Sequence, residues 1–158
     1  MVREIVCNKF FPMKKTLKHK NLVIISIGAN LKNPINTFIR LFRKLYKNNN
    51  INIISTSPIY KNPPFGYKKQ NDFYNATMLI STKLYLLEFY RLIFYLERIF
   101  GRNRIRAFKN APRILDIDIL FFNDSFIRSK KLNIPHLHWQ ERESILIPLI
   151  YQVNYKGF

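Results

Sequence analysis

Apolar and polar positions alternate along the chain in a way that predicts a mixture of strands and helices. Helical periodicity predicts a helix that begins at Pro34 and ends before Asn48, and a long helix over residues 83–100 that Gly101 ends. Residues 139–151 predict one or two short helices, interrupted at Pro148. Short apolar runs rich in β-branched and aromatic residues predict strands at residues 23–27, 51–60, 73–82, 114–122 and 126–134.

The order of these elements favours an α+β fold with a mainly antiparallel sheet and helices packed on it, because strands are joined both by helices and by short turns. A ferredoxin-like arrangement is the leading architecture. The length of 158 residues suits one domain, which we place at residues 21–158. Residues 1–20 carry six Lys or Arg and no continuous apolar stretch, so we predict a basic, partly disordered extension there, with a transit peptide as the alternative.

Composition excludes several classes of protein. With 47% hydrophobic residues, the chain is not globally disordered. Its apolar runs are much shorter than the ~18 residues that a membrane-spanning helix needs, so we expect no membrane partner. Cys7 is the only cysteine and cannot form an internal disulfide, which favours a cytoplasmic location.

The formal net charge of +18 has three explanations that the charge alone does not separate. A basic surface attracts nucleic-acid phosphates and gains free energy from counterion release. The same electric field attracts a small anionic substrate. The abundance of lysine throughout the chain is also consistent with a charge that has no single purpose.

The most informative motif is Asp116-Ile117-Asp118, which lies within an apolar run. Residues two apart on a strand share a face, so both carboxylates point the same way. Two neighbouring anions are unfavourable unless a cation lies between them. Carboxylate oxygens suit Mg²⁺, which completes its shell with water and substrate phosphates. We therefore predict magnesium at Asp116 and Asp118; the alternative is a strand end whose acids are solvated or paired with Arg113.

A basic segment precedes this strand, with six basic residues and no acidic one from Arg98 to Arg113. A mobile cationic loop beside two carboxylates could clamp phosphate, because guanidinium groups match phosphate oxygens; a solvated charge run is the alternative. His136, with Arg142 on the following segment, is a further candidate phosphate donor. Zinc binding by His136 and His138 is disfavoured, since no further Cys or His completes a site.

Two other features have both a functional and a structural interpretation. Glu97 lies on an apolar helical stripe and needs a cationic partner, which the arginines just after the helix could supply, or it anchors the site. The rigid segment 62–66, followed by Phe73 and Asn75, could form a wall in which a ring stacks on a flat heterocycle and an amide reads its edge. The alternative is an ordinary loop with a core Phe and a turn Asn.

In their order and spacing, these motifs resemble the 6-hydroxymethyl-7,8-dihydropterin pyrophosphokinase family of folate biosynthesis, from about Leu22 to Leu149. The matching stretches are residues 27–31, 57–60, 63–66, 70–76, 97 with 101–104, 111–118, and 134–136 with 142. The resemblance implies a ferredoxin-like α+β fold and transfer of pyrophosphate from ATP to the pterin hydroxymethyl group, with release of AMP. It also implies two Mg²⁺ ions bridged by Asp116 and Asp118.

The resemblance also implies roles for individual residues, taken from the matching motif positions. The catalytic set is Arg102, Arg113 and Glu97. The pterin would be bound by Asn62, Pro63, Phe65, Phe73 and Asn75. ATP would be bound by Arg104, Ile119, Lys131, Asn133, His136 and Arg142.

Three positions depart from the family pattern. Ser144 stands where members commonly carry an aromatic residue that would complete a sandwich around the pterin. Ala29 replaces a common serine, and Phe108 or Lys109 stands at the tip of the basic loop in place of an Arg-Trp pair. These departures concern the details of binding more than the identity of the reaction.

Two other functions stay open as hypotheses, namely a basic ferredoxin-like nucleic-acid binder and a different magnesium-dependent phosphoryl or nucleotidyl enzyme. For the pyrophosphokinase we expect a monomer whose partners are these small molecules, with no nucleic acid and no membrane.

Overall fold

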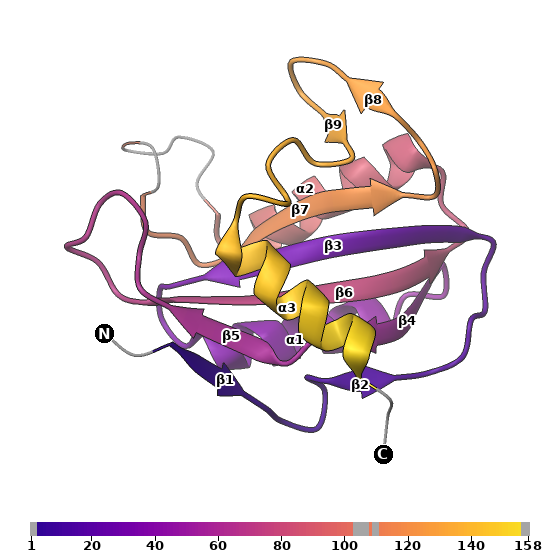
Figure 1. Cartoon of the computed structure of the whole chain (residues 1–158). Coiled ribbons are helices and arrows are strands. Elements are labelled where there is room, and N and C mark those ends of the chain that lie inside the picture. Colours follow the sequence, from indigo (N-terminus) through magenta and orange to yellow (C-terminus); the bar gives the residue numbers. More distant parts are fainter. Residues whose placement is uncertain (1–2, 103–107, 109–110, 156–158) are drawn as a thin grey trace.

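A mainly antiparallel sheet carries helices on both of its faces in the computed structural model, which describes residues 3–102, 108 and 111–155 (Figure 1). None of the helices in this described part is long and apolar enough to cross a membrane. The strands are β1 (Glu4–Val6), β2 (Met13–Lys14), β3 (Asn21–Ala29), β4 (Ile51–Thr56), β5 (Ile59–Asn62), β6 (Phe73–Thr82), β7 (Asp116–Phe122), β8 (Ile127–Arg128) and β9 (Asn133–Ile134). The helices are α1 (Pro34–Tyr46), α2 (Leu86–Ile99) and α3 (Glu143–Asn154).

The centre of the sheet has the strand order β4-β6-β3-β7, and each neighbouring pair is antiparallel. With α1 between β3 and β4 and α2 between β6 and β7, this is the βαββαβ order of the ferredoxin-like fold. The predicted α+β, ferredoxin-like class is therefore confirmed. β4 and β5 pair with successive parts of β6, β1 extends the sheet beyond β5, and β2 pairs with β4.

The main core lies between the sheet and the helices α1 and α2. Alternate residues of β3, namely Val23, Ile25 and Ile27, are at most 1% exposed and belong to one apolar cluster with Phe38 and Leu41 of α1. Side chains two apart on a strand share a face, so this alternation is what a sheet with one helix-covered face requires. The intervening positions of β3 face α3 and the functional cavity described below.

Helix α3 lies across the other face of the sheet from α1 and α2 (Figure 1). The sequence predicted an interruption at Pro148, but one helix runs through it, so that prediction is wrong. A proline removes one N–H donor, and tertiary contacts can offset this loss. Gln152 supplies such contacts, because its buried side chain accepts a hydrogen bond from Thr77 Oγ1 at 2.6 Å and donates to Ser55 Oγ at 2.8 Å.

Two of the predicted strands are divided in the structure. The run 51–60 forms β4 and β5, because Ser57 and Pro58 interrupt the pairing and proline offers no N–H to a neighbouring strand. The run 126–134 is not one strand of the sheet but the short β8–β9 hairpin, which lies beyond β7 (Figure 1). The other three predicted strands, and the helices from Pro34 and within 83–100, are found close to the expected bounds.

The N-terminal segment is part of the fold wherever the structure describes it. β1 pairs with β5 and β2 pairs with β4, while Phe11 is fully buried with its ring about 6 Å from the rings of Phe38 and Phe42. The expectation of a partly disordered extension is therefore wrong for residues 3–20. Its basic composition concealed Phe10 and Phe11, whose burial outweighs the entropic cost of ordering a short segment.

We predict that Phe11→Ala lowers the free energy of unfolding by about 3–5 kcal/mol, because it removes a fully buried ring and leaves a cavity. Urea denaturation followed by circular dichroism measures this change. Leu17→Ala in the same segment is the control, since Leu17 is 63% exposed and its loss should change the stability by less than about 0.5 kcal/mol. Equal stability of the two variants would mean that the segment does not pack on the domain.

Candidate functional site

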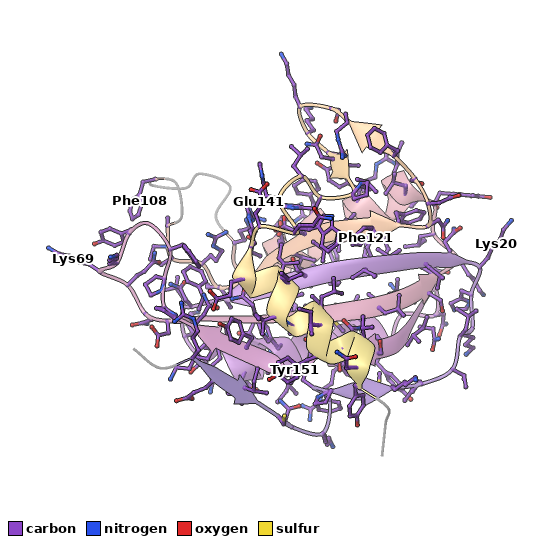
Figure 2. The ribbon with its side chains drawn as sticks, viewed as in Figure 1. Lys20, Lys69, Phe108, Phe121, Glu141 and Tyr151 are labelled. Carbon is purple, nitrogen blue, oxygen red and sulfur yellow. The ribbon has the colours of Figure 1, made fainter. Side chains whose placement is uncertain are left out.

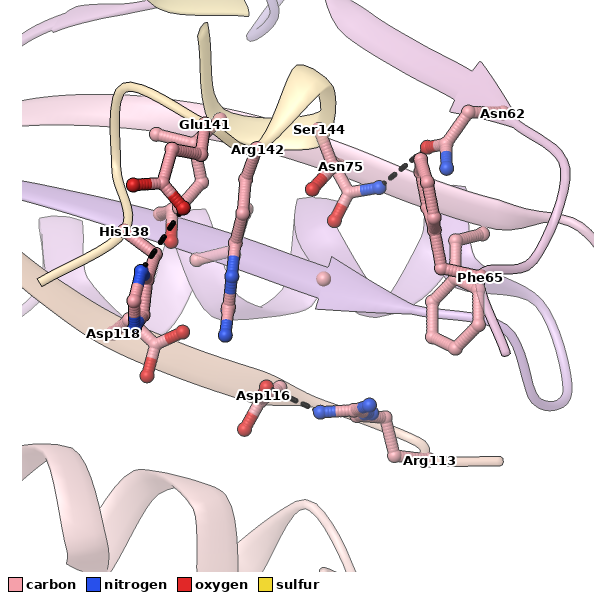
Figure 3. Close-up of a pocket in the computed structure, with 15 residues that line it drawn as sticks. Asn62, Phe65, Asn75, Arg113, Asp116, Asp118, His138, Glu141, Arg142 and Ser144 are labelled. Carbon is pink, nitrogen blue, oxygen red and sulfur yellow. Dashed lines mark hydrogen bonds and ion pairs between the residues drawn. The ribbon is translucent and has the colours of Figure 1, made fainter. Parts of the chain in front are cut away.

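The two carboxylates of the Asp116-Ile117-Asp118 motif lie on β7 and face one cavity of about 390 Å³ (Figure 3). Ile117 between them is 4% exposed and belongs to the core. β7 pairs with β3 so that Asp116 lies opposite Gly28 and Asp118 opposite Ser26. The strand geometry predicted from the sequence is thus found, with both acids on the cavity face.

Asp116 takes part in a network of ion pairs. Its Oδ2 is 2.6 Å from Arg113 Nη1 and its Oδ1 is 3.1 Å from Arg102 Nη1. Arg102 also pairs with Glu97, whose Oε1 accepts a hydrogen bond from the backbone N–H of Ile117 at 2.8 Å. The three residues predicted to be catalytic are thereby brought together at the first aspartate, and the prediction that Glu97 needs an arginine partner is confirmed.

The carboxyl of Glu97 is only 3% exposed and is bound by two groups, the Ile117 N–H and Arg102. Burial raises the pKa of its carboxyl, while the Ile117 N–H and the Arg102 guanidinium act in the opposite direction. An acid in such surroundings connects α2 to β7 and fixes Arg102 beside Asp116. Its role as seen in the fold is therefore to position the basic residue after α2.

Asp118 is the less compensated of the two aspartates. Burial, followed by repulsion from Asp116, raises the pKa of Asp118 to about 6, although Arg142, Arg102 and Arg113 act against this rise. A carboxylate with a pKa raised in this way gains free energy when a cation approaches it. Asp118 therefore shows the repulsion expected of neighbouring carboxylates, whereas Asp116 is paired with Arg113, as in the alternative that the sequence left open.

One wall of the 390 Å³ cavity consists of the amides and rings predicted to bind a heterocycle. Asn62, Phe65, Phe73 and Asn75 all line it, and Asn75 Nδ2 donates a hydrogen bond to Asn62 Oδ1 at 2.7 Å (Figure 3). Pro63, the fifth predicted residue, is not among the side chains of this wall; its carbonyl accepts a hydrogen bond from Asn62 Nδ2 at 3.0 Å. Because Asn75 Nδ2 is bonded to Asn62, Asn75 Oδ1 lies on the side of Gly28, which also lines the cavity.

The close approach of β3 also shapes this wall. A Cβ added at Gly28 would lie 2.8 Å from Asn75 Oδ1, closer than a van der Waals contact permits. α3 contributes Ser144 and Ile145 to this cavity, neither of which carries an aromatic ring. Phe73 has the Arg113 guanidinium 5.4 Å from its ring centre, a distance at which a cation is attracted to the ring.

A second cavity, of about 310 Å³, lies between α2, β7 and the segment that includes β9. It contains most of the residues predicted to bind ATP, together with an apolar wall from α2. Its lining includes Glu97, Arg102, Asp118, Ile119, Lys131, Asn133, His136 and Arg142. Asp118, His138 and Arg142 line both cavities, so the two cavities meet at the second aspartate.

His136 is neutral near pH 7 in this setting. Burial lowers the pKa of its imidazole, and the positive charges of Arg142 and His138 lower it further. The backbone N–H of His138 donates to Nδ1 of His136 at 3.4 Å, which favours the tautomer that carries its proton on Nε2. His136 can therefore offer one neutral N–H donor to an anion in the second cavity.

Part of the basic loop lies outside the described residues, including Arg104 and Lys109. Phe108 is described, and its ring centre lies 5.0 Å from that of Tyr67 (Figure 2). This contact joins the tip of the basic loop to the loop that carries Phe65. Phe108 therefore lies beside the loop that also supplies Phe65 to the 390 Å³ cavity.

Several lining residues were not recognised as site residues from the sequence. Gly28 and Ser26 could have been found from the register of β3 with β7. Tyr90 and Ile93 of α2 form part of the apolar wall of the second cavity, and their helical spacing was read only as a core stripe. Glu141, which is 3.1 Å from His138 Nδ1, has no pattern in the sequence that would mark it.

The donor set around the two aspartates fits a hard divalent cation that is shared with a ligand. No cluster of three or more His, Cys, Asp or Glu side chains suited to a metal occurs in the part of the chain that the structure describes. Mg²⁺ commonly uses one or two carboxylates and takes its other oxygens from water and phosphates. The pair of oxygens beside an open cavity meets that requirement.

In metal-free protein, we predict that Asp118→Asn raises the free energy of unfolding at pH 7.5 by on the order of 1–3 kcal/mol. Because the pKa is raised in the folded state, the folded protein binds a proton that the unfolded chain releases, and wild-type stability falls as the pH rises from about 4 to about 6. The gain should disappear below about pH 4. Urea titrations at several pH values, with the exposed Asp124→Asn as control, measure the difference; parallel curves for wild type and Asp118→Asn would contradict it.

Comparison with known proteins places this chain in a family. The model of the 7,8-dihydro-6-hydroxymethylpterin-pyrophosphokinase family matches residues 24–153. A protein of Helicobacter pylori named 2-amino-4-hydroxy-6-hydroxymethyldihydropteridine pyrophosphokinase is 49% identical over 154 residues, which cover 96% of this chain and 94% of that protein. Proteins of the same name from Campylobacter jejuni and Haemophilus influenzae are 39% and 32% identical and match 90% and 79% of this chain, or 90% and 77% of their own lengths. The chain therefore belongs to the 7,8-dihydro-6-hydroxymethylpterin-pyrophosphokinase family of enzymes.

Proposed function

We propose that this protein transfers the pyrophosphoryl group of ATP to the hydroxymethyl group of 6-hydroxymethyl-7,8-dihydropterin and releases AMP, as a step of folate biosynthesis. The observation that carries this proposal is the meeting of two different cavities at Asp118 and Arg142. One cavity has an amide and aromatic wall suited to a flat heterocycle, and the other has an apolar wall and a basic rim suited to a nucleotide. Family membership supports the same two substrates.

The pterin would occupy the 390 Å³ cavity. Asn75 and Asn62, already linked by a hydrogen bond, would present amide groups to the edge of the ring system, and Phe73 with Phe65 would cover its faces. Pro63 would contribute backbone only, since its side chain does not line this cavity. Ser144 would face the ligand where an aromatic residue is common, so stacking on that side is reduced.

ATP would occupy the 310 Å³ cavity with its phosphates directed to Asp118. Ile119, Lys131 and Asn133 would line the adenosine side, while His136 and Arg142 would donate hydrogen bonds to phosphate oxygens. Arg113 Nε is buried and has no hydrogen-bond partner among the described residues, which leaves a donor for an anionic ligand. Arg104, which lies outside the described residues, stays a proposed ATP-binding residue.

Asp116 and Asp118 would hold two Mg²⁺ ions together with phosphate oxygens. Such ions neutralise phosphate charge and help align the groups that react. Asp116 is paired with Arg102 and Arg113 without ligands, so binding would exchange partners: the arginines would turn to the incoming phosphates as the metal takes the carboxylate. The raised pKa of Asp118 supports this proposal, because an uncompensated carboxylate favours a cation.

The chain would act mainly by positioning its two substrates. The pterin hydroxyl oxygen forms a bond to the β-phosphorus of ATP and loses its proton to water. The bond from that phosphorus to the oxygen shared with the α-phosphate breaks, so AMP departs with that oxygen. Arg102, Arg113 and Arg142 would stabilise the charge on the transferred group, and Glu97 would keep Arg102 in place. A cytoplasmic, monomeric enzyme that binds no nucleic acid stays our prediction.

We expect incubation with ATP, Mg²⁺ and 6-hydroxymethyl-7,8-dihydropterin to yield AMP and the pterin pyrophosphate. Asp118→Ala should lower kcat by at least about 100-fold, since it removes a charge that would align metal and phosphate. Chromatography of the nucleotides distinguishes AMP from ADP, and Asp124→Ala controls for loss of an exposed acid nearby. Formation of ADP alone, or normal turnover by Asp118→Ala, would contradict the proposal.

We further expect Gly28→Ala to raise the KM for the pterin by roughly tenfold, equivalent to about 1.4 kcal/mol. The added methyl group would displace the Asn75 amide, which is the end of a side chain and can move without disrupting the fold. Steady-state kinetics with the pterin varied at saturating ATP measure this effect. In an Asn75→Ala background the same substitution should have no additional effect on KM; an equal effect there would rule out Asn75 as the cause.

A further inference from the structure

Glu143, the first residue of α3, connects this helix to the N-terminal strand. Its Oε1 accepts hydrogen bonds from Arg3 Nε at 2.5 Å and from the hydroxyl of Tyr60. Arg3 immediately precedes β1, and Tyr60 belongs to β5, the strand with which β1 pairs. Three elements that are distant in sequence therefore converge on one carboxylate oxygen, and Arg3 lies outside the 24–153 range that matches the family model.

The residues on either side of Glu143 belong to the candidate site. Arg142 lines both cavities, and Ser144 lines the 390 Å³ cavity. The positive charge of Arg142 acts on both Asp118 and His136. Any shift in the first turn of α3 would therefore move the cation that stands where the two cavities meet.

The first turn of α3 packs on the domain through Ile145, which is 3% exposed, but its N-cap lacks a side-chain hydrogen bond in the described part of the chain. Arg142 is its N-cap residue, yet its side chain makes no capping hydrogen bond within the described part of the chain. Helix starts are usually fixed by such a bond to a free backbone N–H. The far end of α3 is held on the sheet by Gln152, so the contacts of Glu143 are the corresponding attachment at the site end.

The contact between Arg3 and Glu143 is better suited to positioning the start of α3 than to stabilising the fold. The side chains of Arg3 and Glu143 are 54% and 32% exposed, and ion pairs with such exposure contribute little to folding. A displacement of a catalytic group by about 1 Å, in contrast, can lower a rate by about 100-fold. Loss of this pair should therefore be visible in catalysis before it is visible in stability.

We propose that Arg3 and Glu143 are positioning residues, which fix Arg142 at the junction of the two cavities through the start of α3. This inference rests on the proposed function for its kinetic readout. The N-terminal strand would then contribute to positioning, because the pairing of β1 with β5 brings Arg3 to Glu143. The competing explanation is that the contact merely attaches β1 to the domain.

Kinetics of Arg3→Ala and Glu143→Gln test the proposal. We expect each to raise the KM for ATP or lower kcat, with a loss of roughly 10-fold or more in kcat/KM and no appreciable change in urea midpoint. Arg3→Lys should restore part of the activity, because an ammonium group can still pair with Glu143. The matched control is Glu4→Gln, which removes the ion pair that joins Glu4 of β1 to Lys61 of β5 at 3.8 Å and should behave as wild type.

A double-variant comparison separates positioning from attachment. In an Arg142→Ala background, Arg3→Ala should cause no further loss of kcat/KM, because the residue on which it acts is gone. Full activity of Arg3→Ala, an undiminished effect in the Arg142→Ala background, or a loss shared by Glu4→Gln would each overturn the proposal.

A readout without turnover keeps this inference separate from the proposed function. The side-chain Nε–H signal of Arg142, assigned in ¹⁵N spectra by its absence from Arg142→Lys, should shift in Arg3→Ala and not in Glu4→Gln. If wild type releases no AMP, the proposed function fails while this spectral test still stands. If wild type is active and the signal is unmoved in Arg3→Ala, only the positioning proposal fails.

Discussion

The repulsion between two carboxylates on one face of β7 governs the arrangement of this site. Asp116 and Asp118 occupy alternate positions of a strand whose other face is in the core, so neither can turn away without breaking the pairing of β7 with β3. The protein meets the resulting charge with arginines from three segments, which compensate Asp116 closely and Asp118 less well. The less compensated acid lies where the two cavities meet, so an added cation would relieve more unfavourable charge there than beside Asp116.

Basic side chains gather in more than one place on the protein. Some of them surround the aspartates, where Arg102, Arg113 and Arg142 are suited to phosphate. Another group lies elsewhere, in a groove of about 410 Å³ between the N-terminal segment and α1. Cations in that groove include Lys9, Lys14, Lys15, Arg43 and Lys47. The positive charge is therefore not confined to the surroundings of the two aspartates.

The sequence was sufficient for the parts of the fold that follow from local patterns. Short apolar runs rich in β-branched and aromatic residues predicted β3 and β6, and the spacing of Asp116 and Asp118 predicted that both lie on one face. It was insufficient where tertiary contacts override local signals: Gln152 holds α3 together across Pro148, and Phe11 brings a basic segment into the core. The contact of Arg3 with Glu143 spans 140 residues and depends on strand pairing that no local pattern encodes.

The pairing of β1 with β5 has a consequence for self-association. β5 would otherwise present its outer backbone N–H and C=O groups at the edge of the sheet, and such open edges accept strands from other molecules. β1 covers that edge of β5 through three residue pairs, from Glu4 with Lys61 to Val6 with Ile59. A shortened chain that begins after Val6 would leave this edge of β5 unpaired, and we expect it to associate with other molecules more readily than the full chain.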